Sequence, residues 1–288
     1  MKYVCTTEEF LGNYYSKVFP RSIKELDFAD EYALEYIRWE ELLGFCEAHK
    51  AENAELYSLL AEMHLYGKGT EQNEEKAMSL LREGAEKGSP ACMTALANKI
   101  IDRALLDFNY DEAFPLLEKA VSLGYLPACN TLGWLYVKGC GTQMDRKKAL
   151  ELYRAAAEGG LLSGKYNCAV TLARDDAEKA LAYMEEAAGA GYEKAACWLG
   201  QYYLNGVYRE PDYKKAHYWF FNAAWNDSAA AFRYLGEIYE SGKLGEKNLK
   251  KAEFCYKQAI LLGYSGTRRE LARMYREMKE PQESSDDE

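Results

Sequence analysis

Three histidines and eight cysteines are the side chains in this sequence best suited to nucleophilic, acid–base or metal chemistry. His49, His64 and His217 lie far apart, and none has a nearby carboxylate or thiol arranged as a catalytic triad. A cysteine–histidine pair that meets only in space stays open here, although no residue favours it. The cysteines form no CxxC pair, so neither a zinc site nor a disulfide framework is indicated. We expect most of them to be small buried side chains in a reducing compartment. They are Cys5, Cys46, Cys92, Cys129, Cys140, Cys168, Cys197 and Cys255.

The segment GKGT at residues 67–70 resembles a phosphate-binding loop only superficially. It lacks the GxxxxGK[ST] spacing and a preceding strand, and the same turn recurs elsewhere in the chain. Glu74 and Glu75 fall at a predicted helix N-terminus, where carboxylates interact favourably with the helix dipole. The sequence therefore predicts no catalytic residue, no cofactor and no metal ion.

The chain repeats itself every 36 residues, and this period describes the elements that carry these side chains. Small residues that follow a hydrophobic partner recur at steps of 36, with one step of 31: Ala61, Ala97, Gly133, Ala169, Gly200, Gly236 and Ala272. A second series has the same steps: Ala77, Ala113, Ala149, Ala180, Ala216 and Ala252. Such periods indicate solenoids, in which each unit buries its apolar face against its neighbours. His64 falls where four other units carry tyrosine, so we predict that it packs rather than reacts.

Each unit has the pattern of a helical hairpin. In residues 125–160, two apolar patterns at helical spacing flank a glycine-containing turn. The small residue of the first helix lets the neighbouring helix approach closely. In the second helix, Ala149, Leu152, Tyr153 and Ala156 form the expected core stripe. Glycine follows most second helices, where a positive φ is expected, and Asp227 takes that place once at a small cost in strain.

Three segments follow approximately one pattern: LAEMHLYGKGTEQNEEKAMSLLREGAEKG, LGWLYVKGCGTQMDRKKALELYRAAAEGG and LGQYYLNGVYREPDYKKAHYWFFNAAWND. On these motifs the chain resembles the Sel-1-like repeat, a branch of the tetratricopeptide superfamily, whose pattern reads roughly as LGxxY, a GxG turn and KAxxWYxKAAxxG. The resemblance covers about residues 52–275, with six full units and a terminal half. It implies an all-α fold, a right-handed solenoid of αα-hairpins.

Two units depart from the pattern. The second has no glycine in its turn, and Pro115 lies early in its second helix, where proline is tolerated only within the first turn. The fourth is five residues shorter, so its turn in TLARDDAEKA is tight. We predict a local change in superhelix curvature at this fourth unit.

The pattern fades at both ends of the chain. Possible capping boxes begin at Thr6 and Ser22, and EELLGFCEAHKAE resembles a degenerate second helix. The ending KEPQESSDDE is acidic and has no apolar periodicity. We predict three regions: a helical N-terminal cap over residues 1–51, the repeat solenoid over 52–278 and an acidic disordered tail over 279–288.

Composition limits the partners of the chain. A net charge of −10 and a pI near 5.1 argue against nucleic acid, which requires clustered lysine and arginine. No apolar run approaches the ~20 residues of a membrane span, and the first residues lack a signal-peptide run. We therefore expect a cytoplasmic protein without membrane insertion. The oligomeric state is left open, with a monomer favoured.

The outward stripe of the first helices is where we expect function, because the period does not explain it. Counted from the small residue, offsets −6, −3, −2, +1 and +5 point away from the core stripe. Tryptophans on such a stripe are unusual, and carboxamides beside them can bond both backbone groups of an extended peptide. We predict binding through Trp134 and Trp198 as apolar anchors, close to the shortened fourth unit. The full set is Asn98, Thr131, Trp134, Asn167, Trp198, Gln201, Tyr234 and Glu237.

The leading hypothesis is a non-enzymatic scaffold or adaptor that binds a protein or peptide segment in a concave groove. The resemblance implies the same, because Sel-1-like proteins are commonly adaptors. Three alternatives stay open. The tryptophans pack between adjacent first helices; the chain hydrolyses or binds β-lactams, as some cysteine-rich relatives are thought to do; or it is a secreted bacterial effector that binds a host protein. Those relatives carry paired cysteines in every repeat, which this chain does not.

Overall fold

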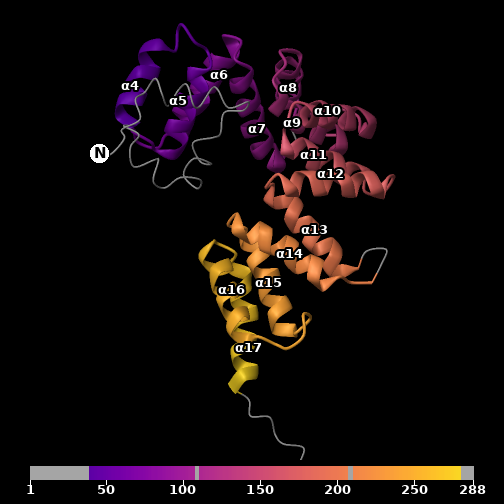
Figure 1. Cartoon of the computed structure of the whole chain (residues 1–288). Helices are drawn as coiled ribbons and strands as arrows, with labels where there is room; N and C mark the ends of the chain where they lie inside the picture. Colours follow the sequence, from indigo (N-terminus) through magenta and orange to yellow (C-terminus); the bar gives the residue numbers. More distant parts are fainter. Residues whose placement is uncertain (1–38, 108–109, 207–209, 280–288) are drawn as a thin grey trace, which may run out of the picture. The chain divides into compact units, whose positions relative to one another are not determined.

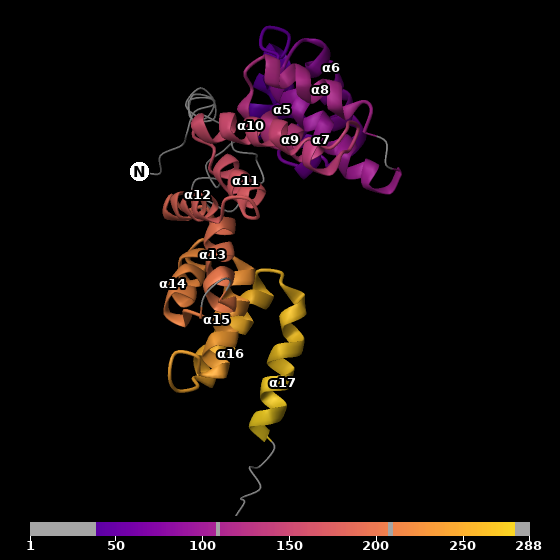
Figure 2. The ribbon, with the colours of Figure 1, turned by 90° about the vertical axis from the view of Figure 1, so that its right-hand side faces the viewer.

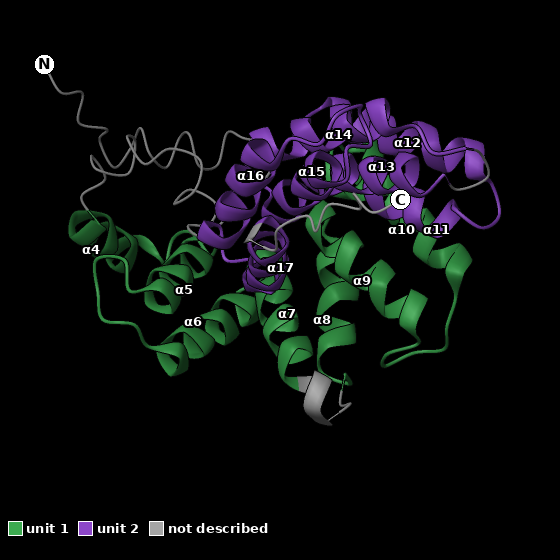
Figure 3. Ribbon diagram, turned by 90° about the horizontal axis from the view of Figure 1, so that it is seen from below, with its two compact units in different colours: residues 1–164 green, residues 165–288 purple. Residues whose placement is uncertain are grey.

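A computed structural model describes residues 39–107, 110–206 and 210–279 of the chain (Figure 1). Every regular element in these ranges is helical, which confirms the predicted all-α class. The chain divides into two compact units, Met1–Gly164 and Lys165–Glu288 (Figure 3). No helix in the described ranges is both long and apolar enough to cross a membrane.

Unit 1 is built from antiparallel pairs of helices that follow the 36-residue period. From α4 to α10 each helix packs against the next one along the chain, and α5 also contacts α7, which contacts α9. The first helices of consecutive repeats are therefore neighbours. The elements are α4 (Trp39–His49), α5 (Leu56–Tyr66), α6 (Glu74–Glu86), α7 (Pro90–Asp107), α8 (Ala113–Ser122), α9 (Leu126–Lys138), α10 (Arg146–Glu158) and the first residues of α11 (Leu162–Leu172).

Unit 2 continues the same arrangement from within α11. In Figure 2, α13 to α16 lie side by side, and each packs against the next. A final single helix packs on α16 and supplies the predicted terminal half unit. The elements are α12 (Ala177–Gly189), α13 (Glu193–Asn205), α14 (Tyr213–Trp225), α15 (Ala229–Ser241), α16 (Leu249–Leu261), the short η1 (Ser265–Thr267) and α17 (Arg268–Lys279).

The small residue of each first helix lies against the core of its own hairpin. A Cβ on Gly133 would come within 2.6 Å of the Tyr153 ring, and a Cβ on Gly200 within 2.5 Å of the Phe220 ring. A Cβ on Gly236 would collide with the ring of Tyr256 in the same way. The three repeats with alanine instead of glycine carry an aliphatic side chain at the equivalent buried position: Leu81, Leu117 and Met184. Glycine therefore accompanies a ring and alanine a smaller side chain, so the volume across each hairpin is conserved within the chain.

An aspartate or asparagine caps the second helix in five of the six hairpins, a feature that was not predicted from the sequence. In each case its side-chain oxygen accepts a hydrogen bond from a backbone N–H of the first turn. The caps are Asn73, Asp145, Asp176, Asp212 and Asn248. The lysine three residues after the cap lies over the tyrosine of the first helix in three repeats, 5.1 to 5.3 Å from the ring centroid. These contacts fix the start of each second helix against its partner.

The two irregular repeats differ from the others in their turns. Helix α7 runs to Asp107, whereas α9, α13 and α15 end one residue before a glycine with positive φ. Pro115 is the third residue of α8 and so lies in its first turn, as predicted. In the fourth repeat only residues 173–176 separate α11 from α12, which confirms the tight turn. The change in curvature expected there stays a prediction.

The ends of the chain are described only in part. Helix α4 coincides with the segment predicted to be a degenerate second helix, and it packs on α5. The capping boxes at Thr6 and Ser22 lie outside the described residues, as does the predicted tail beyond Lys279. In α17 the repeat's small residue, Ala272, is exposed, because no second helix follows it in the described ranges. The boundaries 1–51, 52–278 and 279–288 remain predictions.

Asp227 is the only non-glycine residue with positive φ in the described ranges, at 57°. The equivalent residues after other second helices are glycines, among them Gly191 at 90°. A side chain in this region costs about 1 kcal/mol. We therefore expect Asp227→Gly to raise the free energy of unfolding by about 0.5–1 kcal/mol and the melting temperature by a few degrees. Thermal denaturation checks this, with Gly191→Asp as the reverse change. An unchanged or lower melting temperature for Asp227→Gly would contradict the assignment of strain.

Candidate functional site

His49 and His217 contact structural partners, whereas both ring nitrogens of the buried His64 lack a hydrogen-bond partner among the described residues. His64 is 3% exposed, and burial lowers the pKa of its imidazole, with the nearby Lys76 charge adding to the effect. It occupies the place of the first-helix tyrosines, which confirms its predicted packing role. The Nε2 atom of His217 lies 2.7 Å from the hydroxyl of Tyr239, and Nδ1 of His49 lies 2.9 Å from the carbonyl of Phe45. Neither contact involves a carboxylate or a thiol.

The described cysteines are free thiols, and five of the seven are buried. Burial raises the pKa of Cys46 and Cys92 to about 12 and that of Cys255 to about 11. The thiolate is the nucleophilic form, so a raised pKa makes these thiols poor nucleophiles at neutral pH. No cluster of histidine, cysteine, aspartate or glutamate in the described part of the chain could hold a metal ion.

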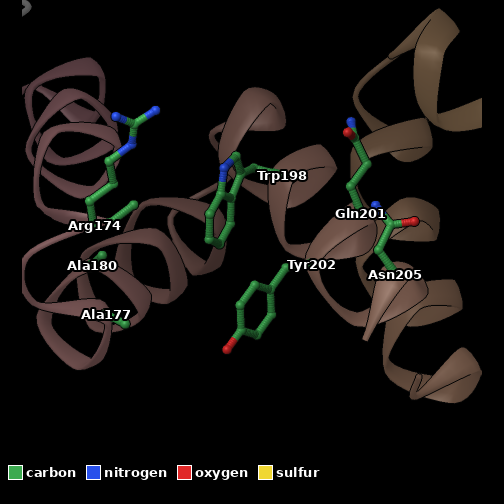
Figure 4. A pocket seen from close by; sticks show the side chains of 8 residues that line it. Arg174, Ala177, Ala180, Trp198, Gln201, Tyr202 and Asn205 are labelled. Carbon is green, nitrogen blue, oxygen red and sulfur yellow. The ribbon is translucent and has the colours of Figure 1, made fainter. Parts of the chain in front are cut away.

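A pocket of about 330 Å³ opens in unit 2 between the tight turn of the fourth repeat and helix α13. We call it the Trp198 pocket. Figure 4 shows Trp198 and Tyr202 at its centre, with Arg174 on one side and Gln201 and Asn205 on the other. Ala173, Ala177 and Ala180 complete the lining. The structure thus brings together two features that the sequence singled out, a tryptophan on the outward stripe and the shortened unit.

Two stacked rings form the apolar part of the Trp198 pocket. The rings of Trp198 and Tyr202 lie 5.3 Å apart between centroids, with an interplanar angle of 13°. They are four residues apart on α13, so one helical turn aligns them. Both side chains are half-buried. One face of the Trp198 ring therefore packs inside the protein, and the other face is available to a ligand. The sequence had left open whether Trp198 binds a ligand or packs between helices, and a half-buried ring is compatible with both.

Polar groups surround these rings and have no partner in the part of the chain that the structure describes. Among the described residues, the indole N–H of Trp198, the carboxamides of Gln201 and Asn205 and the guanidinium of Arg174 make no hydrogen bond or ion pair. Arg174 and Asn205 are exposed. Both occupy offset +5 of their repeats, and reading that offset along the chain would have found them. Tyr202, at offset +2, gave no such signal.

The other predicted residues of unit 2 lie outside the Trp198 pocket. Tyr234 stacks on the buried ring of Phe220 at 4.7 Å, and the guanidinium carbon of Arg233 lies 4.0 Å from the Tyr234 centroid. Glu237 pairs with Arg233 at 3.7 Å and with Lys243 at 3.4 Å. Asn167 on α11 is half-buried, and its backbone carbonyl accepts a hydrogen bond from Thr171. Tyr234 and Glu237 therefore belong to a separate cluster on α15.

Unit 1 holds the remaining predicted residues on neighbouring first helices. The hydroxyl of Thr131 on α9 donates a hydrogen bond of 3.0 Å to Oδ1 of Asn98 on α7. Trp134 on α9 is half-buried, like Trp198. Asn98 is exposed and accepts a hydrogen bond from Thr131, so its amide NH₂ and the second lone pair of Oδ1 stay available as a peptide clamp.

A comparison with known protein families finds repeats along the same part of the chain as the 36-residue period. A family model described as Sel1 repeat matches six segments, residues 54–89, 107–125, 126–161, 172–192, 193–224 and 229–264. Together they cover more than half of the chain. The matches at 107–125 and 172–192 are the shortest, and they fall in the two repeats that depart from the pattern.

Several solved structures share the fold at low sequence identity. A Sel1 repeat protein from Oxalobacter formigenes is 23% identical with a TM-score of 0.68, covering 80% of this chain and 96% of its own. A protective antigen of uropathogenic Escherichia coli is 18% identical with a TM-score of 0.54, covering 89% of this chain and 56% of its own. An immunity protein from Pseudomonas aeruginosa is 20% identical with a TM-score of 0.52, covering 78% and 87%. At such identities the likeness describes the fold alone.

Proposed function

Because the chain belongs to the Sel1 repeat family, whose members generally mediate protein–protein interactions, we propose that it is a non-enzymatic scaffold. Its ligand is a protein or peptide segment that binds along the first helices, with the Trp198 pocket as the main contact. In stacked repeats the first helices present a continuous surface whose outward residues are free to vary.

The observation that carries this proposal is the Trp198 pocket, where an apolar face lies beside unpartnered polar groups. Gln201 and Asn205 can each donate to a carbonyl and accept from an N–H of an extended peptide. The ring of Trp198 supplies an anchor for an apolar side chain, and tryptophan is enriched among residues that dominate binding energy. Arg174 adds a positive charge for a carboxylate of the ligand.

The lining of the Trp198 pocket suits binding better than catalysis. Arg174 is its only charged residue, and histidine, cysteine, serine and carboxylate side chains are absent from it. A nucleophile with a general base is therefore missing from the pocket that contains Trp198. This favours a scaffold over the β-lactam-hydrolysing alternative, for which a nitrocefin assay supplies the control.

Trp134 is the corresponding anchor in unit 1, and we propose that it contacts the same kind of ligand. Its neighbours Asn98 and Thr131 are joined by their hydrogen bond and present one surface. Asn167, Tyr234 and Glu237 are proposed as peripheral contacts. Residues at the edge of an interface contribute less to affinity than a central aromatic anchor.

Trp198→Ala tests the proposal. Loss of a central aromatic anchor costs about 2 kcal/mol or more, which is roughly a 30-fold weaker dissociation constant. The partner is captured from a lysate with the purified chain, and its affinity for wild type and variant is then measured. We expect the melting temperature to change little, because Trp198 is only half-buried.

Trp219→Ala is the matched control, because Trp219 is a tryptophan of the same unit that is half-buried like Trp198 and lies outside the Trp198 pocket. Unchanged affinity of Trp198→Ala for the captured partner would contradict the proposal. A collapse in melting temperature would instead assign Trp198 to the core.

A further inference from the structure

A second surface of unit 2 carries large exposed rings on α14 and α16, which are the second helices of the last two hairpins. A groove of about 540 Å³ lies over α14, α15 and α16, which we call the α14–α16 groove. Phe221, Trp225 and Phe254 line it and are 51%, 80% and 59% exposed. Phe232, Leu235 and Tyr239 of α15 also line it. None of these residues lines the Trp198 pocket.

The repeat itself does not require these rings. The equivalent positions of all the other hairpins are exposed as well. At the place of Phe221 the other hairpins carry Arg82, Glu118, Arg154, Glu185 and Lys257. At the place of Trp225 they carry Glu86, Ser122, Glu158, Gly189 and Leu261, and at that of Phe254 they carry Ser79, Pro115, Glu151, Ala182 and Tyr218. The solenoid therefore folds with charged or small residues there, and the aromatic residues in the last two hairpins have another role.

Burial of these rings would release substantial free energy. Removing a large apolar side chain from water is worth about 1.5–3 kcal/mol. On α14, Phe221 and Trp225 are four residues apart, and their ring centroids are 6.4 Å apart. Contiguous apolar patches rimmed by polar residues typically mark interaction sites. The groove between two neighbouring second helices has the form that accepts the apolar face of an amphipathic helix.

The charge at the rim indicates which partner fits. Lys250 and Lys251 line the groove and both are exposed, and no aspartate or glutamate lines it. Lys250 makes no ion pair with any described residue. The ammonium of Lys251 lies 5.3 Å from the centroid of the Tyr239 ring. This local positive charge stands out in a chain whose net charge is −10.

We propose that the α14–α16 groove is a second protein-binding site, which takes an acidic amphipathic helix. The large apolar side chains of this helix pack on Phe221, Trp225 and Phe254, and its carboxylates face Lys250 and Lys251. A second copy of this chain fits less well, because the groove has no carboxylate to offer to those lysines in a symmetric contact. The site is independent of the Trp198 pocket and stands whether or not that pocket binds a peptide.

The experiment uses two fluorescently labelled synthetic helical peptides and the full chain. Both peptides carry the same stripe of leucine and phenylalanine at i, i+3, i+4 and i+7. One has glutamate on its polar face and the other lysine. We expect the glutamate peptide to bind about tenfold or more tightly than the lysine peptide at low salt, with the difference shrinking at high salt.

Three variants locate the binding. Phe221→Arg should abolish binding of the glutamate peptide, and it should leave the melting temperature unchanged, because two other hairpins carry arginine at this place. Lys250→Glu should reduce the preference for the glutamate peptide. Trp198→Ala should bind like wild type, which separates this site from the Trp198 pocket.

Three outcomes overturn the proposal. In the first, the two peptides bind equally or not at all. In the second, Phe221→Arg binds the glutamate peptide as well as wild type. In the third, sedimentation shows a dimer that Trp225→Ala converts to monomer, which would assign the groove to a second copy of this chain.

Discussion

Replacing Phe220 with alanine is expected to lower the free energy of unfolding of unit 2 by about 3–5 kcal/mol. The Phe220 ring is fully buried at 0% exposure, fills the space over Gly200 and stacks on Tyr234 with an interplanar angle of 15°. Its removal leaves a cavity between α13, α14 and α15 that helix packing prevents from closing. Chemical denaturation followed by circular dichroism measures the loss.

Phe221→Ala is the matched control for this prediction. Phe221 is the next residue of the same helix but is 51% exposed, so its removal should change stability far less. Equal destabilisation by the two variants would contradict the assignment of Phe220 to the inner face of α14. A loss below about 1 kcal/mol for Phe220→Ala would do the same.

Gly200→Ala is expected to destabilise unit 2 by about 1–3 kcal/mol, although alanine favours a helix over glycine. The new Cβ would lie 2.5 Å from the Phe220 ring, so either the ring or helix α13 must shift. The other repeats show how the chain resolves this conflict, because those with alanine carry leucine or methionine across the hairpin. The double variant Gly200→Ala, Phe220→Leu should therefore recover much of the stability lost by Gly200→Ala alone.

Gly189→Ala is the control that measures the effect of replacing a helical glycine with alanine where no side chain lies in the way. Nothing lies within 4 Å of a Cβ on Gly189, which ends α12 in the same unit. We expect this variant to be neutral or stabilising by up to about 1 kcal/mol. If Phe220→Leu fails to relieve Gly200→Ala in a double-mutant cycle, the two positions are not coupled and the packing account is wrong.

The 36-residue period predicted most of the fold, because the residues that recur at this spacing are those buried between helices. Gly200 and Ala216 recur in register with other small residues, and a recurring small residue indicates close helix packing. The same alignment placed His64 among packing residues. The aspartate and asparagine caps followed the same steps, at Asp176, Asp212 and Asn248, and the sequence contained that signal although our prediction did not use it.

The candidate site was only partly predictable. Offsets on a helix tell which face a residue occupies, but not which side chains from different repeats converge. Tyr234 and Gln201 were both predicted to bind a ligand from the outward stripe of the first helices. In the structure Tyr234 stacks on Phe220, whereas Gln201 lines the Trp198 pocket and has no hydrogen-bond partner among the described residues. Offset +5 placed Arg174 on the outward face, but did not indicate that it lines the same pocket as Trp198.

The aromatic groove was not predicted, because only the core stripe of the second helices was compared between repeats, and their exposed faces were not. Phe221 and Trp225 stand out once each second helix is compared with its counterparts in the other repeats. A residue that breaks the exposed, charged pattern of a repeat is as informative there as on the first helices.

Hydrogen exchange of the whole chain, alone and with its captured partner, tests most directly whether the Trp198 pocket is the binding surface. Backbone amides of residues 173–176 lie in a turn and exchange quickly unless a partner covers them. We expect the partner to slow exchange in that turn and in the last turn of α13, and Trp198→Ala to abolish the protection. Unchanged exchange in both segments, with protection elsewhere in the chain, would contradict the proposed site.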